Sequence, residues 1–307
     1  MNRFPLLSHM RPFSKLLFLI IIVFTTFLAM VFIGYLVGIP FFGPDFFTQL
    51  TEANYTDPSN LSLLKYFQII SQFGFFILPP LIFAYLMNGN IKTYLLLNKA
   101  PDYITALLVG CLLFSSLPVI SWLIEMNERM MLPQFLKGLE TWMQQSEKDA
   151  EVVTKIFLGT PSWTGLSVNM LMMVILPAIG EELIFRGVLI RLLREWTGNI
   201  HWAVIISSLL FSAMHMQFYG FVPRLVLGLM LGYVFVWSAN LWMAVIMHLL
   251  NNGFAVVAGF LAARGIIHSG VDEIGASPAF HEILLSLVFS VMFLWMIFMR
   301  QKKIRFS

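Results

Sequence analysis

Charged residues are scarce in this sequence. Aspartate, glutamate, lysine and arginine make up 11% of its 307 residues, hydrophobic residues make up 59%, and the mean hydropathy is +0.82. About a quarter of the residues in a soluble globular domain are charged, so this composition excludes that class of protein. The net charge of +3 is small and scattered, and it gives no reason to expect a nucleic-acid partner. We therefore predict an integral membrane protein in contact with the lipid bilayer.

Cysteine is almost absent as well. Cys111 is the only one, and it lies within an apolar run. A single cysteine excludes an intrachain disulfide, a cysteine-based metal site and C-x-x-C redox chemistry. Internal repeats, low-complexity tracts and flexible linkers are also missing. We therefore expect residues 1–307 to form a single integral membrane domain.

Long apolar runs dominate the chain. A membrane-spanning helix needs about 20 apolar residues, and eight stretches approach this length. The first follows Arg3, Arg11 and Lys15 and lacks a small-residue cleavage site, so we interpret it as a retained span and not as a signal peptide. The predicted fold class is all-α, a polytopic bundle of about eight transmembrane helices. The stretches are Leu16–Val37, Leu64–Met87, Tyr103–Ile124, Leu166–Leu192, Ile200–Met216, Phe221–Trp237, Leu241–Ala263 and Ile283–Met299.

The lysines and arginines predict the orientation of these spans. Cytoplasmic loops carry an excess of both residues. Eight alternating spans place eleven on one side and seven on the other, the seven being Lys65, Arg129, Lys137, Lys148, Lys155, Arg224 and Arg264. We therefore predict that both termini are cytoplasmic, and we expect a bacterial plasma membrane as the location.

A polar segment of about 40 residues, Glu125 to Trp163, separates the third and fourth spans and is too long for a plain connection. Apolar residues recur in it at helical spacing, with lysine, glutamate and glutamine on the other side: Phe135, Leu136, Leu139, Trp142 and Met143. This pattern predicts an amphipathic helix lying in the outer membrane interface. It suits a cap over the bundle, and also a lid that gates substrate entry.

Three ionisable residues interrupt the fourth apolar stretch. Charges inside a membrane are expensive and need a reason to be there. Glu182 and Arg186 are four residues apart on the same helix face, so they can form an ion pair. Glu181 points about 100° away and is left over. It is either a general base in a dry interior or one more member of a structural ion-pair cluster.

Small residues and a proline surround this cluster. Gly180 and Gly187 allow a neighbouring helix to approach closely. Pro177, one turn before Glu181, removes a backbone hydrogen bond and opens the helix towards a pocket. These features predict close helix contacts around the carboxylates.

Two later spans carry further polar groups. In the fifth, His215 lies one turn after Phe211, and in the seventh, Asn252 lies one turn after His248. A single buried histidine is usually a satisfied structural residue. Together with Glu181, however, these side chains predict a common pocket inside the bundle.

The order of these motifs is informative. E-E-x-x-x-R, then F-x-x-x-H, then H-x-x-x-N in successive spans resembles the CPBP family of CAAX-prenyl-protease and bacteriocin-processing (Abi) intramembrane proteases. The resemblance covers residues 171–263, about a third of the chain. It implies an all-helical bundle whose buried site hydrolyses a peptide bond of a membrane-associated peptide or protein.

Peptide hydrolysis requires a base to activate water and donors for the oxyanion. Glu181 suits the base and His215 an assisting group, while His248 and Asn252 suit the oxyanion donors; Glu182 and Arg186 form the structural ion pair. A zinc ion held by Glu181, His215 and His248 is the alternative, although the compact H-E-x-x-H pattern is absent. We favour activation of water by Glu181 without a metal cofactor.

A different class of function would also use buried charges. A membrane transporter or a non-catalytic immunity protein could bind a substrate or relay protons with the same residues. Transporters often contain internal repeats and broken helices, and neither is evident in the sequence. A purely structural scaffold would leave His215, His248 and Asn252 without a purpose.

Overall fold

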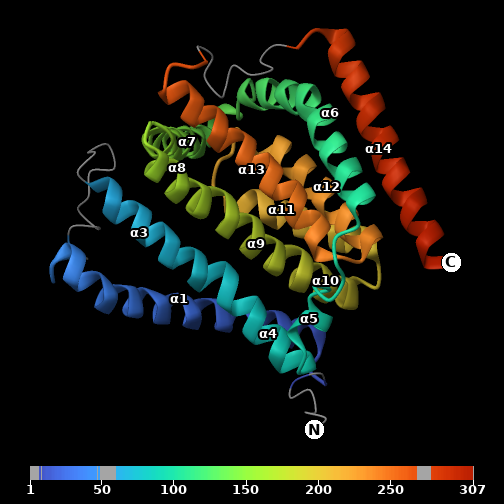
Figure 1. The fold of residues 1–307 in the computed structure, drawn as a ribbon, viewed down its shortest axis with the longest axis horizontal. Coiled ribbons are helices and arrows are strands. Elements are labelled where there is room, and N and C mark those ends of the chain that lie inside the picture. Colours follow the sequence, from blue (N-terminus) through green and yellow to red (C-terminus); the bar gives the residue numbers. More distant parts are fainter. Residues whose placement is uncertain (1–6, 8, 47, 49–59, 268–277, 307) are drawn as a thin grey trace.

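The computed structural model describes residues 7, 9–46, 48, 60–267 and 278–306, with side chains up to Gln301. All regular elements in these ranges are helices, which confirms the predicted all-α bundle (Figure 1). In chain order the elements are α1 (Pro12–Phe42), α3 (Leu61–Gln72), η2 (Phe73–Ile77), α4 (Leu78–Asn88), α5 (Ile91–Tyr94), α6 (Tyr103–Glu128), η3 (Gln134–Leu136), α7 (Lys137–Leu158), α8 (Trp163–Asn169), η4 (Met170–Ile175), α9 (Leu176–Glu182), η5 (Leu183–Leu189), α10 (Ile190–Thr197), α11 (Ile200–Met214), α12 (Phe221–Ser238), α13 (Leu241–Ala263) and α14 (Phe280–Phe306).

Helical stretches occur at all eight predicted spans. By length and composition, seven stretches of the described chain can cross a membrane: Pro12–Phe42, Leu61–Asn88, Tyr103–Glu128, Trp163–Thr197, Phe221–Ser238, Leu241–Ala263 and Phe280–Gln301. The eighth, α11, has only 15 residues and is therefore about 22 Å long. This is shorter than the roughly 30 Å hydrocarbon core of a bilayer. Seven of the eight predicted spans are thus long enough to cross a membrane, and the eighth is a short apolar helix.

One end of the bundle is tied together by polar contacts. Lys15 Nζ, near the start of α1, lies 2.6 Å from Glu195 Oε1 in α10. Arg191 donates to the carbonyl of Tyr94 in α5 at 2.6 Å. Further contacts at this end join Arg300 to Asp102, and Asn240 to the carbonyls of Lys99 and Ala100. The first and last helices therefore have Lys15 and Arg300 at the same end.

The opposite end is closed by α7, an amphipathic helix as predicted. Glu147 of α7 accepts a hydrogen bond from the backbone N–H of Tyr219 at 3.2 Å, and the rings of Trp142 and Phe218 lie 5.3 Å apart. Asn127, near the end of α6, donates to the carbonyl of Phe218 at 2.7 Å. The loop between α11 and α12 is thereby held between α6 and α7.

The helix from Trp163 to Thr197 is the most deeply buried of the seven full-length stretches. Figure 1 shows α9 between α1 and α3 on one side and α6 and α14 on the other. Wide π-helical turns, η4 and η5, flank α9, and such turns are frequent at functional sites. A Cβ at Gly180 would lie 2.6 Å from Cβ of Phe76, and one at Gly187 would lie 2.8 Å from Cδ2 of Leu95. The two glycines therefore permit the close helix contacts predicted around the cluster.

Candidate active site

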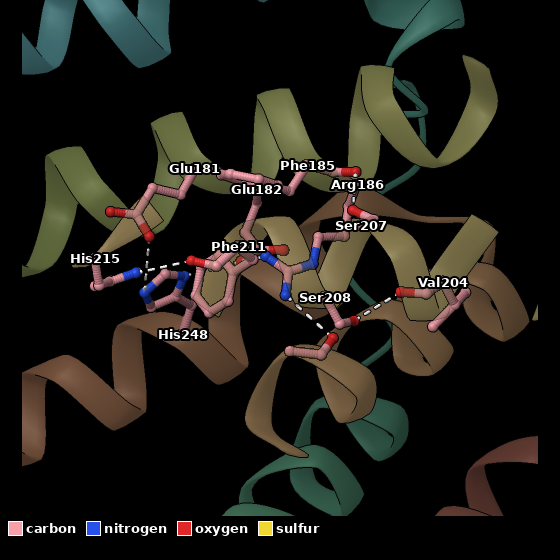
Figure 2. Close-up of polar contacts among 11 residues, drawn as sticks. Glu181, Glu182, Phe185, Arg186, Val204, Ser207, Ser208, Phe211, His215 and His248 are labelled. Atoms are coloured by element: carbon pink, nitrogen blue, oxygen red, sulfur yellow. Dashed lines mark hydrogen bonds and ion pairs between the residues drawn. The ribbon is translucent and has the colours of Figure 1, made fainter. Parts of the chain in front are cut away.

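A buried ion pair forms the foundation of the site. Arg186 Nη1 donates to Glu182 Oε1 at 2.8 Å, and the side chains are 1% and 0% exposed (Figure 2). Nη2 of Arg186 donates to the carbonyl of Gly228 in α12 at 3.2 Å, and its guanidinium lies 4.5 Å from the ring centre of Phe211 in α11. The ion pair expected from the spacing is therefore present, and Arg186 also links the central helix to α11 and α12.

His248 of α13 connects the two glutamates. Its Nδ1 lies 2.9 Å from Glu182 Oε1, and its Nε2 lies 3.9 Å from Glu181 Oε2. The side chain is almost fully buried. When Nδ1 carries a proton it donates to the Glu182 carboxylate, and this bond fixes the ring with Nε2 facing Glu181.

Glu181 is buried but incompletely hydrogen-bonded. It is 6% exposed, and its Oε2 accepts no hydrogen bond from any residue that the structure describes. With Glu181, Glu182 and Arg186 all ionised, the cluster carries one negative charge. Oε2 of Glu181 and Nε2 of His248 face each other at 3.9 Å without a direct hydrogen bond.

His215 follows the last residue of α11 and is half-buried. Its Nδ1 lies 2.9 Å from the carbonyl of Phe211, so Nε2 is the nitrogen left for other partners. The Phe211 ring centre lies 5.1 Å from that of His215 and 6.0 Å from that of His248. Figure 2 shows both histidines on the side of the cluster where Glu181 lies. The fold therefore gathers Glu181, His215 and His248 around Phe211.

Asn252 lies one turn beyond His248 and has a different neighbour. Its Nδ2 donates to the carbonyl of Met173 in η4 at 3.1 Å, and its Oδ1 accepts from Asn251. Met173 lies in the π-helical turn η4, and Pro177, four residues later, has no N–H to donate to this carbonyl. Asn252 supplies a donor in its place. The described structure shows no hydrogen bond between Asn252 and Glu181 or either histidine.

Part of the chain is similar to a known protein family. Residues 163–254 match the family model described as Rce1-like, type II CAAX prenyl endopeptidase Rce1-like. The predicted resemblance to the CAAX-protease family is confirmed for this segment. The match includes all the residues of the three motifs, and it supports a CAAX-type intramembrane endopeptidase in a multi-pass membrane protein. No curated protein and no solved structure matches the chain.

The donors in this CAAX-protease segment do not fit a zinc site. No three His, Cys, Asp or Glu side chains in the described ranges converge closely enough to hold a metal ion. The Nδ1 atoms of His215 and His248 face the carbonyl of Phe211 and the carboxylate of Glu182, which leaves Nε2 of each ring as the nitrogen open to a ligand. Structural and catalytic zinc sites need at least three converging protein ligands. The set Glu181, His215 and His248 does not provide them in this arrangement.

One further charged residue of the same segment makes contacts that the sequence did not predict. Arg224, in the first turn of α12, donates from Nη1 to the carbonyl of Gln217 at 3.0 Å and from Nη2 to the side-chain oxygen of Gln217. The sequence indicated Arg224 only as one of the basic residues that predict the orientation of the spans. The available signal was its position: an arginine within an apolar helix, nine residues after His215.

Proposed function

We propose that this protein is a CAAX-type intramembrane endopeptidase in which Glu181 activates the hydrolytic water. The observation that carries the proposal is the buried Oε2 of Glu181, which has no hydrogen-bond partner among the described residues and faces Nε2 of His248. A carboxylate in this state can accept a proton from water. The family match of the same segment supports peptide hydrolysis as the reaction.

In the proposed reaction one proton moves from water to Glu181 and then to the leaving amine. The reaction begins with Glu181 ionised and His248 protonated between the two carboxylates. Water attacks the scissile carbonyl and gives a proton to Glu181, with His215 assisting, while the carbonyl oxygen becomes an oxyanion. Protonated His248 then stabilises that oxyanion. The C–N bond breaks as Glu181 returns its proton to the leaving amine, releasing a carboxylic acid and an amine.

The remaining site residues receive supporting roles. Glu182 and Arg186 form the structural ion pair, and Glu182 also orients His248. Asn252 is proposed as the second oxyanion donor, because an amide nitrogen carries two hydrogens and Met173 takes only one.

The proposed setting is a bacterial plasma membrane with both termini in the cytoplasm and residues 125–163 outside. The common end of Lys15 and Arg300 supports placing the termini on one side, and the lysine and arginine distribution supports the cytoplasm. The proposed substrate is a membrane-associated peptide or protein.

The test is cleavage by the purified protein in proteoliposomes. Peptides ending in a CAAX motif, with and without a prenyl group, are incubated with the wild type and with Glu181→Gln, and products are identified by mass spectrometry. We expect an internal peptide bond to be cleaved by the wild type and spared by the variant. Absence of cleavage in every peptide would contradict the proposed function.

A further inference from the structure

Arg224 is a half-buried cation without an acidic partner. Among the described residues, no carboxylate lies within ion-pair distance of its guanidinium, and both of its hydrogen bonds go to the neutral Gln217. It also occupies the first turn of α12, where the helix dipole is positive and a cation is unfavourable. A buried charge of this kind is usually paired or binds a ligand. Nothing in the ion-pair network of Glu182 and Arg186 requires Arg224.

The position of Arg224 relates it to the active site. The loop joining α11 to α12 begins at His215 and folds back so that Gln217 and Gly220 contact the guanidinium. The same loop also contacts Glu147 of α7. Glu147 itself accepts from the backbone of Tyr219. The guanidinium thus lies against the loop that begins at His215, and its five N–H donors exceed the two bonds made to Gln217.

We propose that Arg224 binds the C-terminal carboxylate of the peptide substrate. This inference rests on the proposed function and specifies which peptides the site accepts. A CAAX motif ends at the C-terminus, so a bond inside it lies at most three residues, about 10 Å of extended chain, from a free carboxylate. Arginine is well suited to this role, because its planar guanidinium can donate two parallel hydrogen bonds to one carboxylate.

A lipid phosphate is the competing anion, since an arginine near the end of a span can extend to the headgroups. The hydrogen bonds to Gln217 and the contact with Gly220 instead hold Arg224 against the His215 loop. A lipid role would affect all substrates alike, whereas carboxylate binding affects only those with a free C-terminus. Peptides with and without a free C-terminal carboxylate therefore distinguish the two roles.

The experiment compares one peptide in two forms, with a C-terminal carboxylate and with a C-terminal carboxamide. Values of kcat/KM are measured in proteoliposomes for the wild type, Arg224→Gln, Arg224→Lys and Arg264→Gln. Arg264 is a matched control because it is exposed and its guanidinium lies over the rings of Trp163 and Phe260. We expect the wild type and the control to prefer the carboxylate by on the order of 10- to 100-fold. Arg224→Gln should lose this preference, so that it cleaves the carboxylate peptide no faster than the carboxamide peptide, and Arg224→Lys should retain part of the preference.

The outcomes separate this inference from the proposed function. Equal cleavage of both forms by the wild type would overturn the role of Arg224 and leave the peptidase proposal standing. An equal loss on both peptides in Arg224→Gln, at unchanged thermal stability, would assign Arg224 to lipid binding and overturn the inference. Absence of cleavage of either form by the wild type would refute both proposals together.

Discussion

His248 and Arg186 share one oxygen of Glu182. Nδ1 of His248 lies 2.9 Å and Nη1 of Arg186 lies 2.8 Å from the same Oε1, in a setting where the glutamate is fully buried. One carboxylate oxygen therefore balances a cation and orients the ring that faces Glu181. In a low-dielectric interior such a network is strong when complete and costly when broken.

Glu182→Gln should therefore damage the fold. The substitution keeps the shape but leaves the buried guanidinium of Arg186 without a counter-charge. We expect the stability of the protein to fall by roughly 3 to 5 kcal/mol, with activity lost because the protein folds poorly. Thermal unfolding in detergent measures this loss. A variant as stable as the wild type would contradict the structural role of Glu182.

Glu181→Gln should have the opposite signature. It removes only the basic lone pair of a side chain that no described residue anchors by a hydrogen bond to Oε2. We expect wild-type thermal stability, normal peptide binding and loss of cleavage, by at least on the order of 10²-fold. Cleavage at a near wild-type rate, or a stability below that of Glu182→Gln, would show that Glu181 is not the base.

Asn252→Ala tests a bond between two helices. Without the amide, the carbonyl of Met173 lacks its donor, and we expect a loss of about 1 to 3 kcal/mol. Pro177→Ala restores a backbone N–H that can reach the same carbonyl, so the loss should be smaller in the double variant. Additive losses would argue against this account.

Activity in the double variant separates the two roles of Asn252. If Asn252 also donates to the oxyanion, cleavage should stay low although stability recovers. Recovery of both would limit Asn252 to positioning α9 against α13.

The orientation of the chain can be tested at Gln145, which is exposed on α7. In a Cys111→Ser background, Gln145→Cys should react with a membrane-impermeant thiol reagent added outside intact cells. A cysteine introduced at Lys92, between α4 and α6, should react only after the cells are opened. The reverse pattern would contradict cytoplasmic termini.

The metal content provides a further test. Because Glu181, His215 and His248 do not converge as ligands, we expect the purified protein to carry far less than one zinc per chain and to keep its activity after chelator treatment. Elemental analysis and a cleavage assay measure both. One tightly held zinc per chain, lost in His215→Ala and in His248→Ala, would overturn this expectation.

Periodicity was sufficient to predict the helices and the Glu182–Arg186 pair. Both depend on contacts within one helix, where spacing determines which side chains share a face. The spacing of Glu181 also correctly separated it from Arg186. Contacts between helices were harder to foresee, because a sequence does not specify how each helix is rotated about its axis.

The neighbours of His248 and Asn252 illustrate this limit. Both residues lie on one face of α13, yet His248 contacts the two glutamates while Asn252 contacts the carbonyl of Met173. Only Pro177 hinted at the second contact, by leaving a carbonyl without a donor. The contacts of Arg224 were not foreseen for a related reason, since they depend on a loop conformation that no periodic pattern encodes.

The short length of α11 has a consequence for the surrounding bilayer. The helix exposes Trp202, Leu210 and Met214 along one side, yet it falls about 8 Å short of the hydrocarbon thickness. A hydrophobic mismatch of this kind is relieved when the membrane thins locally. Thinning at the His215 end would bring headgroups and water down to the level of Glu181. The bilayer next to α11 would then supply water to the proposed endopeptidase.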